Sequence, residues 1–271
     1  MSKKRKKQYY VVVRGYKPGL YTTWFGENGA AEQVEGFPQA VYRGFYSLED
    51  ASVWLASQED DLLAQLSPDL QDLLEQDHST GYEESPESLL EAGKVVIYTD
   101  GGAIDNPGPG GYGIVLRYKE HRKELSGGFR STTNNRMELL ACIEGLEALK
   151  NPCKVVLYSD SRYVVHGITK GWAKKWQANG WKLNKMRKAE NVDLWNQLLA
   201  LCEQHAVEFR WVRGHTGNPD NERCDQLAMQ AASRSSLPPD TAFETGETQE
   251  ASITLFAMQK SCPASTAIPP H

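Results

Sequence analysis

The sequence lacks both a hydrophobic run long enough to cross a membrane and a pairing pattern among its cysteines. Among its 271 residues no stretch approaches the roughly 18 uncharged apolar residues that a transmembrane helix needs. The basic start, residues 1–7, is not followed by an apolar run, which argues against a secretory signal. The five cysteines are scattered and form no C-x-x-C pair, which argues against a disulfide framework or a zinc site. We therefore expect a cytoplasmic protein that does not bind a membrane.

Positive charge is absent from the middle of the chain. Residues 58–93 contain no Lys or Arg but 11 Asp or Glu. The flanking regions are basic, with 8 Lys or Arg against 5 Asp or Glu in residues 1–55 and 21 against 15 in residues 94–236. The net charge of −5 therefore conceals two basic blocks. Such blocks suit a polyanionic ligand, but surface lysines of ordinary globular proteins give the same pattern, so charge alone does not decide.

Residues 8–57 have the pattern of a small α+β domain, preceded by the basic arm 1–7. Segments rich in Val and Tyr predict strands at 8–14, 20–25 and 41–45, and a capping box at Ser47-Leu48-Glu49-Asp50 predicts a helix to about residue 57. The acidic segment 58–93 is predicted to be a linker that keeps the two basic blocks apart. Its leucines recur at helical spacing, but a solvated spacer with transient helices is preferred over stable amphipathic helices.

Residues 94–234 alternate between strand and helix patterns. We predict strands at 94–99, 112–118, 123–129, 154–159 and 207–212, a loop at 100–111, and helices at 134–150, from 161, at 191–203 and at 220–233. Hairpin strands combined with crossovers predict an α/β domain whose mixed five-stranded sheet is flanked by helices. The proline-containing residues 235–271 are predicted to be a disordered tail.

Two acidic residues directly follow apolar strands. Asp100 follows residues 95–99, and Asp160 follows residues 155–159. If these strands are parallel neighbours, both carboxylates lie at the same sheet edge, and Glu138 and Asp225 of two helices are candidates to join them. Each residue taken alone is more often a cap, turn or surface residue. Together, four carboxylates need hard cations among them, and Mg²⁺ or Mn²⁺ is the natural choice.

Four separated segments of this region resemble, in order, the signature segments of the type 1 ribonuclease H family. They are Tyr98-Thr99-Asp100-Gly101-Gly102, Thr132-Thr133-Asn134-Asn135-Arg136-Met137-Glu138, Tyr158-Ser159-Asp160-Ser161, and Gly214-His215-Thr216-Gly217 leading to Asn221-Glu222-Arg223-Cys224-Asp225. The resemblance extends over residues 94–233 and implies a ribonuclease H-like fold.

The resemblance implies an endonuclease that hydrolyses the RNA strand of RNA–DNA hybrids and leaves 5′-phosphate and 3′-hydroxyl ends. It assigns two Mg²⁺ ions, with Mn²⁺ as a substitute, to the four carboxylates Asp100, Glu138, Asp160 and Asp225. One ion activates the attacking water and the other stabilises the leaving 3′ oxygen. It also implies that His215 assists, as a proton carrier or in product release, and a titrating imidazole suits either task.

Recognition of the hybrid requires groups that distinguish the 2′-hydroxyl of RNA. The resemblance places Gly101, Asn106, Asn134 and Asn135 near the RNA strand and Thr133 at a DNA phosphate. The two adjacent asparagines also fit a simple capping role for the helix that follows them, and Asn134 fits both roles.

Residues 170–188 interleave lysines with tryptophans and resemble the basic protrusion that some family members place beside the DNA strand. Lys175, Trp176 and Trp181 are its candidate substrate contacts, although the tryptophans also fit a packing role against one another, which we expect to dominate. Lys175 stands where bacterial relatives often have asparagine, which puts its phosphate role in doubt.

The amino-terminal domain resembles the hybrid-binding domain that precedes eukaryotic and some bacterial ribonucleases H. The resemblance rests on Tyr9-Tyr10-Val11-Val12, Gly15, Gly19, Thr23-Trp24, Gln33-Val34, Phe37-Pro38 and Tyr42-Arg43-Gly44-Phe45. It implies that Tyr10, Trp24 and Tyr42 pack on sugars of the DNA strand and that Arg43 reaches a phosphate. The family often has a second basic residue where Gly44 stands, so weaker DNA affinity is implied.

The main alternative is a non-catalytic hybrid-binding protein, which would be expected to lack one of the four carboxylates. A DNA nuclease or transposase of related fold would lack the 132–138 segment and the hybrid-binding domain. A reverse-transcriptase fragment is the third alternative. We expect a monomer whose partner is an RNA–DNA hybrid.

Overall fold

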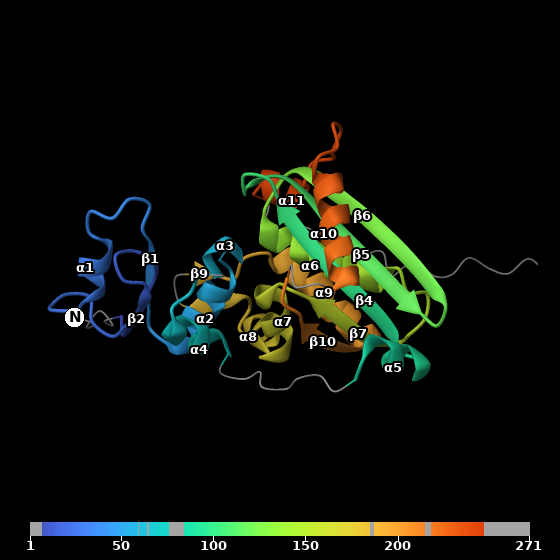
Figure 1. Cartoon of the computed structure of the whole chain (residues 1–271), viewed down its shortest axis with the longest axis horizontal. Helices are drawn as coiled ribbons and strands as arrows, with labels where there is room; N and C mark the ends of the chain where they lie inside the picture. The colour runs from blue at the N-terminus through green and yellow to red at the C-terminus, as the bar shows by residue number, and fades with distance from the viewer. Residues whose placement is uncertain are drawn as a thin grey trace, which may run out of the picture.

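A three-stranded and a five-stranded β-sheet organise the chain, and short helices lie between them (Figure 1). The computed structural model describes residues 7–246, except residues 59, 64, 76–83, 185–186 and 215–217. Among the described helices, none is both long and apolar enough to cross a membrane.

The small sheet has three antiparallel strands in the order β2-β1-β3: β1 (Tyr9–Arg14), β2 (Gly19–Tyr21) and β3 (Val41–Phe45). The unpredicted helix α1 (Ala30–Val34) packs on one face and α2 (Leu48–Ala56) on the other. The prediction of β3 is confirmed, whereas the strand predicted at 20–25 ends at Tyr21. The predicted helix cap is also confirmed, because Ser47 Oγ accepts from the Asp50 N–H at 3.1 Å.

The acidic segment forms three helices, α3 (Asp60–Leu63), α4 (Pro68–Glu75) and α5 (Pro86–Glu91). The preferred interpretation, a solvated spacer, is wrong for the described residues, because most of the segment's leucines are buried. Leu66, Leu70, Leu73 and Leu74 join the core around α2, whereas Leu89 and Leu90 pack against the large sheet. The leucine spacing gave α4 an apolar stripe, and burying that stripe outweighs the solvation of its acidic face.

Polar contacts fix α4 in place between the two sheets. The Asp69 carboxylate accepts from the Leu20 N–H at 2.6 Å, and the Leu73 carbonyl accepts from Ser52 Oγ at 3.3 Å. Helix α2 in turn contacts α7 (Arg162–Thr169). The acidic segment thus joins the two basic regions instead of keeping them apart (Figure 1).

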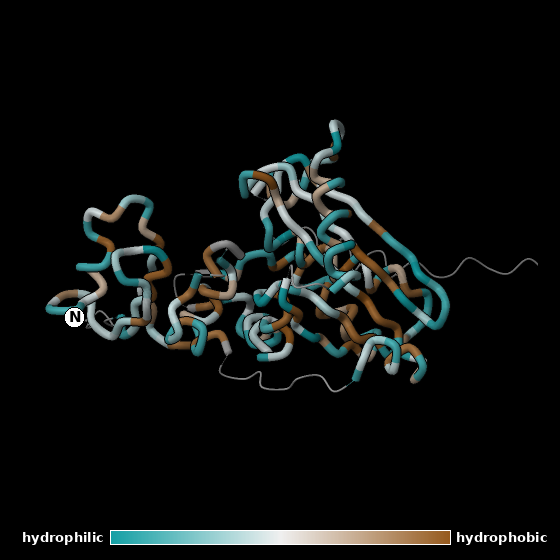
Figure 2. Tube along the Cα trace, in the orientation of Figure 1, coloured by the Kyte–Doolittle hydropathy of each residue, from teal (hydrophilic) through white to brown (hydrophobic). Residues whose placement is uncertain are grey.

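The large sheet confirms the predicted α/β fold class, with strands in the order β10-β7-β4-β5-β6. Its strands are β4 (Val95–Ala103), β5 (Gly108–Tyr118), β6 (His121–Thr132), β7 (Lys154–Ser159) and β10 (Ala206–Trp211). Strands β4, β7 and β10 are parallel, and β5 and β6 continue from β4 as antiparallel hairpins. Hydrophobic residues concentrate along the central strands (Figure 2).

Helices cover both faces of the large sheet. Helices α6 (Asn134–Glu147), α7 and α9 (Val192–Gln204) share one apolar cluster with Ile97, Ile114 and Leu157. On the opposite face α10 (Pro219–Ala232) and α5 pack against a second cluster, in which the rings of Tyr98 and Tyr158 stack at 4.7 Å. Between α7 and α9 the chain forms α8 (Trp172–Ala178) and the short pair β8 (Lys182–Asn184) and β9 (Arg187–Lys188).

Two sequence-based predictions fail near the ends of these elements. The loop predicted at 100–111 is largely strand, because β4 continues through Asp100 to Ala103 and β5 begins at Gly108. The disorder predicted from residue 235 is wrong up to residue 246, since α11 (Thr241–Glu244) packs against β6. Residues 247–271 lie outside the described part of the chain.

Candidate metal centre and nucleic-acid interface

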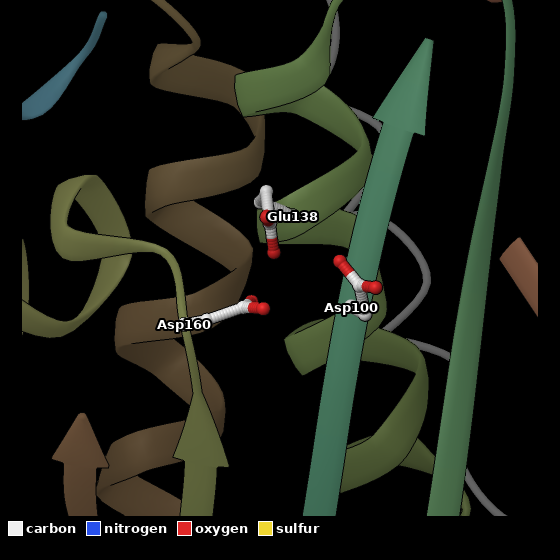
Figure 3. Close-up of side chains that lie close together, drawn as sticks. All are labelled: Asp100, Glu138 and Asp160. Carbon is white, nitrogen blue, oxygen red and sulfur yellow. The ribbon is translucent and has the colours of Figure 1, made fainter. Parts of the chain in front are cut away.

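Three carboxylates from separate segments meet at one point of the large sheet. Asp100 lies within β4, Asp160 follows β7 directly, and Glu138 lies in the second turn of α6. One carboxylate oxygen from each lies within 4.8 Å of the others, and the side chains face a common space (Figure 3). The parallel β4–β7 pair aligns Thr99 with Ser159, which confirms the predicted arrangement that brings the two aspartates together.

Close packing of α6 against β4 brings Glu138 into this group. Gly101 lies under the helix, and a Cβ atom there would come within 2.5 Å of the Glu138 backbone nitrogen. Residue 101 must therefore lack a side chain for the helix to approach the strand this closely. Glu138 itself is buried.

Asp225 lies on α10 and lines the same cavity, of about 260 Å³, as the three clustered carboxylates. Its carboxylate is not one of the three that lie within 4.8 Å of one another. The structure thus brings all four predicted residues to one cavity but sets Asp225 apart from the tight group. His215 lies outside the described residues.

A neighbouring asparagine contacts the cluster, and sequence reasoning had given it no role. Asn221 Nδ2 donates to Asp160 Oδ2 at 3.1 Å, and the Asp160 carbonyl accepts from Trp211 Nε1 at 2.9 Å. Asn221 is buried and lies four residues before Asp225, one turn away on the same face of α10. This four-residue spacing within the 221–225 segment could have indicated from the sequence that Asn221 lies at the site.

Burial and nearby negative charge shape the electrostatics around the cluster. Burial raises the pKa of the Cys224 thiol well above its ordinary value, and the carboxylates of Asp100 and Asp160 add to the effect. Burial likewise raises the pKa of the Cys142 thiol, with smaller contributions from Glu138 and Asp160. Both thiols therefore remain neutral, and the carboxylates dominate the charge of the site.

The three asparagines predicted to contact RNA line one cavity at the start of α6, where two of them are hydrogen-bonded to each other. Asn106 Oδ1 accepts from the Asn134 N–H at 3.1 Å, so the β4–β5 turn caps this helix. Asn134 Oδ1 instead accepts from the Ala103 N–H at 2.7 Å, which corrects the expectation that Asn134 caps its own helix. Asn135 Nδ2 donates to the Ser57 carbonyl at 3.4 Å. Thr133 lies at the helix N-cap position, where its side chain makes no capping hydrogen bond.

The basic protrusion divides its residues between packing and surface. Trp176 is buried with its ring edge-on to Trp195 at 5.8 Å, and the partly buried Trp181 packs against the same core. Lys175 is exposed, and its ammonium pairs with the Glu49 carboxylate of α2 at 2.6 Å. Lys175, a predicted contact to the DNA strand, therefore already pairs with a side chain of the amino-terminal region.

The predicted contacts of the small sheet separate onto two faces. The Tyr10 ring lies 5.2 Å from Trp24, and Trp24 lies 5.5 Å from Tyr42; we call these three residues the aromatic patch. Arg43 follows Tyr42 in β3, and successive strand residues point to opposite faces. Arg43 lines a cavity on the side of α2 together with Trp54 and Trp176.

Comparisons with known proteins agree with this site. A family model described as RNase H matches residues 92–233, and one described as Ribonuclease H1 N-terminal domain matches residues 8–55. The ribonuclease H of Syntrophus aciditrophicus is 62% identical over 150 residues, covering 55% of this chain and 87% of the relative. That of Desulforamulus reducens is 65% identical over 147 residues, covering 54% and 92%.

The chain belongs to the ribonuclease H family. The enzyme is a type 1 ribonuclease H with an amino-terminal hybrid-binding domain, and it cleaves the RNA strand of RNA–DNA hybrids. The non-catalytic alternative is therefore not supported. Among solved structures, LC9-RNase H1, a type 1 RNase H with the type 2 active-site motif, is 33% identical with a TM-score of 0.47, covering 59% of this chain and 83% of that one.

Proposed function

We propose that the enzyme hydrolyses the RNA strand with two Mg²⁺ ions held by Asp100, Glu138, Asp160 and Asp225, and leaves 5′-phosphate and 3′-hydroxyl ends. The observation that carries this proposal is the group of three carboxylates within 4.8 Å of one another. Hard oxygen donors at this spacing, on three separate segments, fit a Mg²⁺ ion and disfavour a soft metal. These carboxylates would hold the two ions, whose positive charge would supply activation of the attacking water and stabilisation of the leaving 3′ oxygen.

The residues around the carboxylates orient them. Asn221 donates to Asp160 and would hold one of its oxygens in place while the other binds cation. The close contact between Gly101 and the Glu138 backbone fixes the distance between β4 and α6. His215 is proposed to carry a proton or assist product release, as its family position implies.

Recognition of the hybrid is proposed to divide between two surfaces. Gly101, Asn106, Asn134 and Asn135 line the carboxylate cavity or the adjoining one and would contact the RNA strand. Thr133, Lys175, Trp176 and Trp181 would contact the DNA strand, with Trp176 acting mainly through packing. The aromatic patch and Arg43 would bind the DNA strand from the amino-terminal domain.

We also propose the functional division of the chain. Residues 1–7 form a basic arm, 8–57 the hybrid-binding domain, 58–93 the connecting acidic segment, 94–234 the catalytic domain and 235–271 a carboxyl-terminal tail. We propose that the enzyme acts as a monomer, which sedimentation of the full chain would test. The scattered cysteines favour a cytoplasmic location.

Cleavage of an end-labelled RNA–DNA hybrid tests the metal site. Asp100→Asn should abolish cleavage in Mg²⁺ while hybrid binding persists, and EDTA should stop the wild-type enzyme. Asp105→Asn is the matched control, because Asp105 is an exposed carboxylate in the adjoining turn with a positive φ that asparagine tolerates. Wild-type cleavage by Asp100→Asn, or cleavage in EDTA, would refute the proposal.

The finer claims need separate measurements. Ligation of the cleaved fragments would identify the 5′-phosphate and 3′-hydroxyl ends. Calorimetric titration of Mg²⁺ into the enzyme with a non-cleavable hybrid would count the ions, and a single binding event would contradict the two-ion assignment.

A further inference from the structure

The aromatic patch has at its edge a lysine of the basic arm that was not among the predicted substrate contacts. In the antiparallel β1–β3 pair, Tyr10 lies opposite Gly44, so both residues face the same side of the small sheet. Tyr10 is the member of the aromatic patch nearest to this position. Whatever lies over Gly44 therefore lies beside the patch.

The side chain of Lys7 lies over Gly44. A Cβ atom at residue 44 would come within 2.7 Å of Lys7 Cδ and 2.9 Å of the Tyr10 ring. Backbone contacts hold this part of the chain, because the Gln8 N–H donates to the Phe45 carbonyl at 2.9 Å. The Tyr10 hydroxyl also donates to the Lys7 carbonyl at 3.4 Å. These contacts place the alkyl chain of Lys7 beside Tyr10, at the edge of the patch.

The Lys7 ammonium is available for a ligand. Lys7 is exposed, and it forms no ion pair within the described residues. It lines the cavity of about 420 Å³ that Arg43 also lines. Asp50 and Glu190 line the same cavity, so the charge there is mixed, whereas the alkyl chain of Lys7 lies over Gly44 beside the Tyr10 ring.

We propose that Lys7 binds a backbone phosphate of the hybrid whose sugars pack on the aromatic patch. Sugars and phosphates alternate along a strand, so a strand on the patch must carry a phosphate past its edge. An ammonium there neutralises one phosphate and releases a counterion, without reading sequence. The assignment rests on the proposed role of the patch. Lys7 would supply a cation beside Gly44, a position that has no side chain of its own.

Salt-dependent hybrid binding tests the assignment. Full-length enzyme carrying Asp100→Asn, which leaves the hybrid uncut, is titrated with a fluorescent hybrid over a range of salt concentrations. Adding Lys7→Gln should weaken binding several-fold and lower the slope of log Kd against log salt by about one. Lys7→Arg should restore both. Lys17→Gln is the control, because it makes the same charge change at an exposed lysine of the same domain.

The variants and modified hybrids distinguish the possible outcomes. Equal Kd and equal slope for Lys7→Gln and Lys17→Gln would overturn the assignment of Lys7. If Trp24→Ala still weakens binding in that case, the proposed role of the patch survives; if it binds like the parent, that role fails too. Neutral methylphosphonate linkages in the DNA strand identify the strand. A Lys7→Gln effect that disappears with them assigns the phosphate to DNA, and one that persists assigns it to RNA.

Discussion

Replacing Asp240 should destabilise the catalytic domain far more than its place in the tail suggests. Asp240 is buried and accepts from Arg136 Nε at 2.7 Å, from Arg136 Nη2 at 2.9 Å and from Thr132 Oγ1 at 2.7 Å. It also caps α11 by accepting from the Phe243 N–H at 3.3 Å. The Asp193 carboxylate holds the other edge of Arg136 at 3.0 and 2.8 Å.

The magnitude follows from what Asp240→Ala leaves behind. Removing one member of an isolated buried ion pair costs about 3–5 kcal/mol, because the other charge is left uncompensated. Here Arg136 keeps Asp193, so we expect a loss of about 2–3 kcal/mol, which corresponds to the charge-assisted hydrogen bonds alone. Burial lowers the pKa of the Arg136 guanidinium, but the two carboxylates raise it above its ordinary value, so Arg136 stays charged.

Urea denaturation of the full chain measures this loss. Asp240→Asn keeps the cap and the size of the side chain and should lose less than Asp240→Ala. Glu244→Gln is the surface control. Glu244 lies in the same segment as Asp240 but pairs with the exposed Arg130 of β6, so this substitution should change stability little. A loss below about 1 kcal/mol for Asp240→Ala, or one equal to that of Glu244→Gln, would refute the argument.

Three further perturbations follow from individual contacts. Glu49→Gln should lower the KM for hybrid by at most about five-fold, since an exposed pair with Lys175 is worth up to about 1 kcal/mol. Glu144→Gln should raise Tm at pH 7: burial raises the folded-state pKa of Glu144 above its ordinary 4.5, so folding penalises the charged form. That gain should fade as pH falls through the folded pKa toward 4.5. Gly113→Ala should displace α10 and abolish cleavage, because the added methyl group would collide with the Cys224 carbonyl.

Matched variants check each of these outcomes. Glu35→Gln removes an exposed charge from the same domain as Glu49, and an equal fall in KM would attribute the effect to net charge. Glu120→Gln, in the exposed β5–β6 turn, should leave the pH dependence of Tm unchanged. Gly145→Ala adds a methyl group 3.2 Å from Ile97 and should keep cleavage activity; similar losses at both glycines would refute the specific role of Gly113.

Local patterns predicted the parts of the fold that local forces determine. Strands β3 and β7 have their predicted bounds: β7 is built on an apolar run, and β3 is rich in the Val and aromatic residues that favour strands. The helix cap at Ser47 followed from side-chain chemistry alone. Parallel pairing of β4 with β7 then carried Asp100 and Asp160 to one edge, so these two site residues were predictable from strand positions.

Composition gave wrong predictions for two segments in which a few buried residues fix the structure although many others are exposed. The acidic segment contains Asp69, which accepts a backbone hydrogen bond, and a leucine stripe that fills a gap beside α2. In the tail, a single buried Asp240 docks a proline-containing stretch that otherwise has the composition of disorder. Neither partner surface is visible in the segment's own sequence, because each is formed by residues outside that segment.

The glycines of β4 and β5 show why the predicted loop at 100–111 is largely strand. Glycine often indicates a turn because its backbone can adopt conformations that other residues avoid. In β4 and β5 the property that matters is instead that glycine has no side chain. At Gly111 and Gly113 an added Cβ would collide with the backbone of α10, and at Gly101 with that of α6. Larger side chains would hold both helices away from the sheet. Glu138 and Asp225 would then retreat from Asp100, so the glycine-rich stretch is a condition for the carboxylate cluster.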